Sequence, residues 1–267
     1  MASVNRDGLT IHYEVFGQGP RLFVFNGSGA TIESTRWMLD ALARQFTVLV
    51  HDQRGLGKTG VADGGDPATM ADFAADGKAV LDALGWDDAA IFGMSFGGMV
   101  AQEFAVTFPD TVSRLALLCT SSGGAGGSSY PLHTLASLTA TERQRIAIYN
   151  LDTRFTPEWL AEHPSDQGLV DVMTNSATIE KSDDVQRGEA AQLAARAGHD
   201  TWDRLGLIAC PTLVAAGRFD ALAPLANSEA LAGAIPNAEL DVFEGGHLFI
   251  VQDRRALPRV MEFLLGE

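Results

Sequence analysis

Apolar residues follow two spacings along the chain, and the two spacings alternate. Short apolar runs indicate strands that are buried on both faces, whereas apolar residues three or four positions apart indicate amphipathic helices. The predicted strands are 9–16, 21–25, 46–50, 89–92, 112–119, 211–215 and 238–243. The predicted helices are 32–44, 69–84, a segment from Met99 to Pro109, 225–234 and 254–265. Because apolar strands alternate with helices, the pattern predicts an α/β fold with a mostly parallel sheet covered on both faces.

This alternation ends after residue 119. Small and polar residues occupy 121–129, SSGGAGGSS, which predicts a linker or hinge rather than a regular element. Residues 130–205 show no clear strand, and helical spacing recurs there at 141–150, 157–162, 169–173 and 189–197. We therefore expect a core made of 1–122 and 206–267, with a helical cap, 123–205, inserted between its two parts.

Composition narrows the class of protein. Hydrophobic residues make up 46% of the 267 positions, enough for one large core. A net charge of −15 disfavours nucleic-acid phosphates and anionic membrane surfaces as partners. The N-terminal segment lacks the apolar stretch of a secretory signal, and no run of about 18 apolar residues predicts a membrane span. We expect a cytoplasmic protein with reduced thiols at Cys119 and Cys210, no metal site and no cofactor.

The segment most indicative of chemistry is Gly93-Met94-Ser95-Phe96-Gly97. It lies between a predicted strand and a predicted helix, which is the arrangement of a nucleophile elbow. Two glycines permit a sharp turn that presents Ser95 at the end of the strand. The pentapeptide alone arises by chance in Gly-rich chains, and the flanking strand and helix are what support Ser95 as a nucleophile.

A serine hydroxyl needs a base, and the base needs an acid to orient it. His247 follows the last predicted strand and Asp220 follows the strand 211–215, so both lie at the carboxyl edge of the sheet with Ser95. The chain order Ser95, Asp220, His247 is the order that follows a nucleophile elbow. Asp220 could instead cap the helix at 225–234, and His247 could be a loop residue without a role.

Acyl transfer also requires donors for a developing oxyanion. The backbone N–H of Phe96, directly after Ser95, is one candidate. The Gly-rich loop Asn26-Gly27-Ser28-Gly29 follows the strand 21–25, and the N–H of Ser28 is the second candidate. Read alone, this loop is an ordinary glycine turn.

Five segments taken together, RLFVFNGSGA, HDQRGLGKT, GMSFGG, AAGRFDALAP and EGGH, resemble the α/β-hydrolase fold superfamily. The resemblance implies a mostly parallel eight-stranded sheet with a helical cap after the sixth strand. It assigns the nucleophile to Ser95, the acid to Asp220, the base to His247 and the oxyanion amides to Ser28 and Phe96. Many members have His where this chain has Asn26, and Asn there is similar to the 3-oxoadipate enol-lactonase branch.

These observations predict a cofactor-free serine hydrolase that acts on a small carboxylic ester or lactone. The cap would define the substrate pocket, although the same side chains are often simple cap core. The candidate pocket residues are Asn26, Met94, Tyr130, Leu132, Phe155, Trp159, Met173 and Leu248.

Other functions use the same residues. Carbon–carbon bond hydrolysis of a vinylogous diketone would use this triad, with Arg143, Arg145 or Arg154 contacting an acidic substrate. A cofactor-free haloperoxidase or perhydrolase is a further enzymatic alternative. A ligand receptor or regulator on the same fold is the non-enzymatic one. The sequence predicts no particular oligomeric state.

Overall fold

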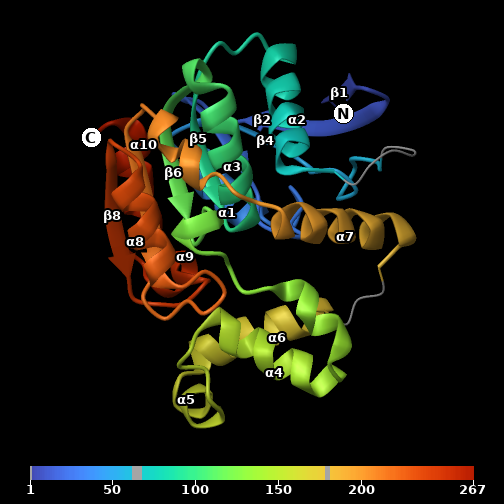
Figure 1. Cartoon of the computed structure of the whole chain (residues 1–267), viewed down its shortest axis with the longest axis vertical. Coiled ribbons are helices and arrows are strands. Elements are labelled where there is room, and N and C mark those ends of the chain that lie inside the picture. The colour runs from blue at the N-terminus through green and yellow to red at the C-terminus, as the bar shows by residue number, and fades with distance from the viewer. Residues whose placement is uncertain (1, 62–67, 178–180) are drawn as a thin grey trace.

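The computed structural model describes residues 2–61, 68–177 and 181–267. In this part of the chain, eight strands form one sheet in the order β1-β2-β4-β3-β5-β6-β7-β8 (Figure 1). The two pairs β1–β2 and β2–β4 are antiparallel and the remaining pairs are parallel. The strands are β1 (Ala2–Arg6), β2 (Leu9–Phe16), β3 (Arg21–Phe25), β4 (Thr47–His51), β5 (Ala89–Met94), β6 (Val112–Leu118), β7 (Thr212–Gly217) and β8 (Ala238–Phe243).

Helices cover both faces of this sheet. Side chains of α2 (Met70–Ala83), α3 (Phe96–Thr107) and α8 (Leu225–Ala234) pack into one core cluster. Those of α1 (Arg36–Leu42), α9 (Phe249–Gln252) and α10 (Ala256–Leu265) pack into the other. The central strands are buried on both sides, as their continuous apolar runs predict. Two helices differ from their predicted bounds, since α1 is shorter than 32–44 and α3 begins at Phe96 rather than Met99.

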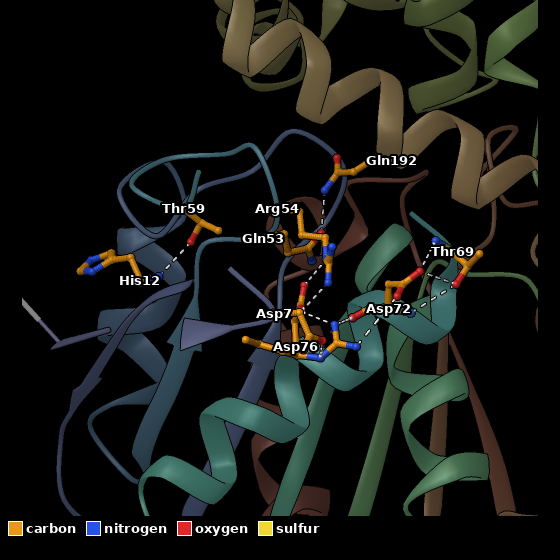
Figure 2. Close-up of polar contacts among 10 residues, drawn as sticks. Asp7, His12, Gln53, Arg54, Thr59, Thr69, Asp72, Asp76 and Gln192 are labelled. Carbon is orange, nitrogen blue, oxygen red and sulfur yellow. Dashed lines mark hydrogen bonds and ion pairs between the residues drawn. The ribbon is translucent and has the colours of Figure 1, made fainter. Parts of the chain in front are cut away.

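The hydrophobic pattern did not reveal β1, whose five residues are mostly polar and exposed. This edge strand is held by polar contacts as well as by its ladder with β2. Arg6 of β1 and Arg54 both bond to Asp76 of α2, and Figure 2 shows Arg54 beside Asp76. Arg6 Nη1 and Arg54 Nη2 each lie 2.8 Å from Asp76 Oδ1. Burial raises the pKa of Asp76 and the two guanidinium groups oppose that shift, so the carboxylate depends on both partners.

Four helices lie in sequence between β6 and β7: α4 (Ala140–Leu151), α5 (Pro157–Glu162), α6 (Pro164–Ala177) and α7 (Asp183–Ala197). In Figure 1, α4, α5 and α6 form a group beside the sheet, and α7 returns the chain toward the core. Helices α6 and α7 are longer than the predicted 169–173 and 189–197. Polar N-caps such as Ser182, which accepts from Val185 N, start helices whose first turns carry little apolar signal.

The segment predicted as a linker without structure contains a 3₁₀ turn. Such turns occur at Pro109–Thr111, Gly124–Gly126, Leu132–Ser137 and Trp202–Leu207. Both cysteines are free thiols. None of the described helices is long and apolar enough to cross a membrane. The division of the chain at residues 123 and 205 stays a prediction.

Stability should fall in mild acid because two histidines are buried in neutral form. Burial lowers the pKa of both His51 and His199 to about 4. The unfolded chain binds their protons near pH 6.5 and the folded chain does not, so the stabilisation is complete above pH 6.5 and is lost as the pH falls toward 4. We expect the unfolding free energy from urea titrations to fall by about 3 kcal/mol per histidine between those limits.

Replacing His51 with Phe, beside the rings of Phe23 and Phe25, should make that pH dependence shallower. Replacing the exposed His133 with Gln should leave it unchanged. Equal slopes for His51→Phe and the wild type would contradict the assignment.

Candidate active site

Ser95 stands at the tip of β5 in a strained turn. Its φ of 55° is in the region that non-glycine residues rarely adopt, and helix α3 begins at the next residue. The turn brings α3 close to the end of β3, where a Cβ on Gly97 would lie 2.0 Å from Phe25 O. Ser95 N donates to Leu118 O at 2.8 Å, and the Thr120 hydroxyl donates to Ser95 O at 2.9 Å. Hydrogen bonds to residues at the end of the neighbouring strand therefore hold Ser95 in the conformation that exposes its hydroxyl.

Three side chains predicted from separate loops meet at this edge of the sheet. His247 Nε2 lies 2.9 Å from Ser95 Oγ, and His247 Nδ1 lies 2.7 Å from Asp220 Oδ2. Asp220 is buried, and its other oxygen accepts from the N–H groups of Leu222 and Ala223 at 2.8 Å each. These two N–H donors fix the carboxylate, which in turn fixes the imidazole ring with Nε2 toward Ser95.

Residues 150–153, at the end of α4, connect the cap to the loops of Asp220 and His247. Leu151 O accepts from His247 N at 2.5 Å, and Asn150 O accepts from Leu222 N at 3.1 Å. Thr153 N donates to Phe219 O at 2.9 Å. The sequence did not predict that this segment contacts the site, because the contacts use main-chain atoms, which are the same in every residue. The positions of the acid and the base thus depend partly on the cap.

The loop Asn26-Gly27-Ser28-Gly29 lies directly against the nucleophile. A Cβ on Gly27 would lie 3.7 Å from Ser95 Cβ. Gly29 N already donates to Gln192 Oε1 at 2.8 Å, whereas Ser28 N has no acceptor among the described residues. The Ser28 amide that the sequence favours is therefore not committed to another acceptor among the described residues.

Two glutamines hold this loop, and neither was predicted. Gln192 of α7 donates through Nε2 to Gln53 Oε1 at 2.6 Å, as Figure 2 shows, and Gln53 Nε2 donates to Asn26 O at 2.8 Å. Both side chains are nearly fully buried. Gln53 lies in the HDQRG segment already noted in the sequence, but its partner on the cap is 139 residues away and could not be inferred.

Replacing Gln192 with Ala should lower kcat, measured with an activated test ester, by about tenfold, because one misplaced oxyanion donor typically costs 10²–10³ in kcat and the loop retains its other contacts. KM should change little. The measurement is steady-state kinetics together with the melting temperature. The control is Gln186→Ala, an exposed glutamine on the same helix. Equal effects of the two substitutions on kcat would rule out the positioning role.

The predicted pocket residues do not share one cavity. Tyr130 and Leu132 line a cavity of about 220 Å³ beside α7, and Phe155 lines another of about 870 Å³ among the cap helices. Trp159 and Leu248 pack with Phe155 in a small apolar cluster that joins the cap to the His247 loop. Met94 packs against the sheet core, and Met173 on α6 is 45% exposed. The buried side-chain amide of Asn26 has no partner among the described residues.

The sequence model of the alpha/beta hydrolase fold matches residues 20–253, which include every candidate residue above. The chain belongs to the α/β-hydrolase fold family. Its eight-stranded, mostly parallel sheet and flanking helices agree with that family, so the predicted fold is confirmed. Among the described residues, no three His, Cys, Asp or Glu side chains are grouped so that they could hold a metal ion.

Members of this α/β-hydrolase family that resemble the chain are named as hydrolases. The poly(3-hydroxyalkanoate) depolymerase of Ectopseudomonas oleovorans is 32% identical over 255 residues, covering 92% of this chain and 84% of its own length. The 3-oxoadipate enol-lactonase 2 of Acinetobacter baylyi is 25% identical, with 96% and 93% covered. The solved structure of Est816, named as an N-acyl homoserine lactone degrading enzyme, is 25% identical with a TM-score of 0.78 and 99% of each chain covered. The protein is therefore a hydrolase enzyme.

Proposed function

We propose that this α/β-hydrolase cleaves a small carboxylic ester or lactone through a covalent acyl-enzyme on Ser95. The single observation that carries the proposal is the continuous hydrogen-bonded path from Ser95 Oγ through the His247 ring to Asp220, at 2.9 and 2.7 Å. The enol-lactonase and the lactone-degrading enzyme among its relatives support this substrate class.

In the proposed mechanism, His247 Nε2 accepts the Ser95 proton as Ser95 Oγ attacks the substrate carbonyl. Asp220 keeps the Nδ1–H of the ring oriented and stabilises the imidazolium that forms. His247 then returns the proton to the leaving alkoxide, which departs as the alcohol. In the second half, His247 takes a proton from water, the resulting hydroxide attacks the acyl-enzyme, and Ser95 is regenerated as the acid leaves.

The negative charge on the carbonyl oxygen needs donors during both halves. We assign this role to the N–H groups of Phe96 and Ser28, which flank Ser95 from α3 and from the loop after β3. Support comes from the close approach of Gly27 to Ser95 and from the commitment of Gly29 N to Gln192. Each such donor typically contributes about 3 kcal/mol to the transition state.

The test is a rate panel of 4-nitrophenyl esters from acetate to octanoate, with γ- and δ-lactones followed by proton release. Turnover well above the rate in buffer, falling with acyl length, supports a small ester or lactone as the substrate. A control panel of amides should react far more slowly. Negligible turnover on every ester and lactone, together with a large ligand-induced rise in melting temperature, would contradict the proposal and favour a receptor.

A further inference from the structure

The cavity of about 220 Å³ beside α7 has a polar wall that the proposed mechanism does not use. Met99 of α3 and Leu132 contribute apolar surface to it, and Arg196 and His199 contribute polar groups. A cavity of this size holds a group of a few non-hydrogen atoms. Its lining combines one cation with apolar contacts, which is the composition of a site that orients an organic anion.

Arg196 forms no ion pair within the part of the chain that the structure describes. Its Nε donates to Ser129 Oγ at 3.0 Å and its Nη2 donates to Tyr130 O at 3.2 Å, so both of these partners are neutral. The nearby acidic group is Asp220, whose carboxylate is already bonded to His247 and to two amides. By contrast, Arg154 of the cap pairs with Asp152 at 2.6 Å. Burial lowers the pKa of Arg196 to about 10, so the guanidinium stays charged at neutral pH.

His199 supplies a second polar side chain, and one of its two ring nitrogens is unpaired. It is 7% exposed, its Nε2 lies 3.1 Å from Ser121 O, and its Nδ1 has no hydrogen-bond partner among the described residues. With Nε2 donating to the carbonyl, Nδ1 is an acceptor. A buried polar atom of this kind normally has a partner, so the unpaired Nδ1 is an unusual feature of this cavity wall.

Helix geometry puts two residues of the cavity wall within one helical turn of residues at the Ser95 site. Gln192 contacts the loop beside Ser95, and Arg196 follows it on α7 by four residues, which is about one turn or 6 Å. On α3, Met99 of the cavity wall likewise follows Ser95 by four residues. Helix α3 therefore reaches the cavity wall within one turn of Ser95, and α7 reaches it within one turn of its contact with the loop beside Ser95.

We propose that this cavity binds a carboxylate carried by the substrate, with Arg196 as the residue that recognises it. The inference rests on the proposed ester or lactone hydrolase function and specifies its substrate class. The carboxylate and the scissile carbonyl are separated by two to four bonds of acyl chain, the span that one helical turn allows. The guanidinium recognises the anion through charge-assisted hydrogen bonds.

The experiment compares monoethyl succinate with ethyl pentanoate, which have similar acyl lengths and differ in the terminal carboxylate. The wild type should hydrolyse the charged ester with the higher kcat/KM. In Arg196→Gln, the ratio of the two kcat/KM values should fall by about tenfold or more, mostly through KM, because a hydrogen bond to a charged group is lost. The rate on ethyl pentanoate should stay within about twofold. An unchanged ratio overturns the proposal.

Three further variants separate charge from structure. Ser129→Ala removes one contact of Arg196 and keeps its charge, so the ratio should be retained; a loss equal to that of Arg196→Gln means that Arg196 only anchors the linker and overturns the proposal. Arg196→Lys should keep more of the ratio than Arg196→Gln, and equal losses count against charge recognition. Arg187→Gln, which removes an exposed arginine of α7, the helix that carries Arg196, should have no effect on the ratio. Melting temperatures check that each variant is folded.

Failure of the proposed function is distinguishable from failure of this inference. If the wild type hydrolyses neither ester, calorimetry with succinate and with neutral succinamide tests the cavity directly. Binding of succinate alone, lost in Arg196→Gln, supports the carboxylate site. Absence of succinate binding, or equal binding of the amide, overturns it.

Discussion

Replacing Ser95 with Ala should lower kcat/KM for ester hydrolysis by about 10⁵-fold or more, since removal of a serine nucleophile abolishes the covalent route and leaves only substrate binding and oxyanion stabilisation. The fold should persist, because the Ser95 hydroxyl contacts only His247 among the described residues while its backbone makes the structural bonds. The melting temperature should therefore move by no more than a few degrees.

Covalent labelling makes this prediction specific to one residue. A fluorophosphonate probe should add its phosphonyl group to Ser95 in the wild type, and mass spectrometry of the digested protein should locate it there. Ser34→Ala, which removes an exposed serine near α1, serves as the control and should label as the wild type does. Full esterase activity in Ser95→Ala, or a label on another serine, would show that the nucleophile lies elsewhere.

The second large effect is expected at Asp220. Asp220→Asn should lower kcat by about 10³–10⁴-fold with little change in KM, because an amide nitrogen facing His247 Nδ1 favours the wrong tautomer of the ring. The side chain keeps its size, and the amide oxygen can still accept from Leu222 and Ala223 N–H. A loss of activity would therefore report on the tautomer of His247 and not on collapse of the Asp220 loop.

Asp253→Asn is the matched control for this substitution. Asp253 is also a buried acid that accepts a backbone amide, from Glu244 at 3.1 Å, and it pairs with Arg255 instead of a histidine. Guanidinium and amide hydrogen bonds hold the pKa of Asp253 far below its usual range, so its loss affects stability. We expect reduced stability and nearly unchanged kcat. A kcat for Asp220→Asn as high as that of Asp253→Asn would argue against the orienting role.

The cap has consequences for both substitutions. Residues 150–153 hold the loops of Asp220 and His247, and Gln192 of α7 holds the loop Asn26-Gly27-Ser28-Gly29, so helices α4 and α7 contribute to the geometry around Ser95. A substitution in the cap that shifts either contact should lower kcat. This coupling gives a physical reason to examine cap substitutions by kcat as well as by substrate preference.

The predictable parts of the fold share one physical cause. Strands β3 to β7 are mostly apolar because helices cover both faces, and each contains a short apolar run that is visible from the sequence. Strand β1 was missed because one edge strand with polar, exposed side chains has no such pattern; Arg6 and Asp76, 70 residues apart, secure it. Helices α6 and α7 were placed but predicted too short, whereas α4 and α5 lie within one residue of their predicted bounds.

By itself, the sequence determined which residues carry the proposed chemistry. Ser95, Asp220 and His247 each follow a strand, and parallel strands bring their carboxyl ends to one edge, so chain order and local pattern suffice to bring the three together. Only the tertiary structure decided what surrounds them. Gln192 accepts a hydrogen bond from Gly29 N, and Leu151 O accepts one from His247 N. Arg196 bonds to Ser129 and Tyr130 and has no ionic partner among the described residues. These contacts join segments far apart in the chain through main-chain atoms and single side chains. No periodicity records such contacts, because each depends on how the cap and the sheet pack against one another.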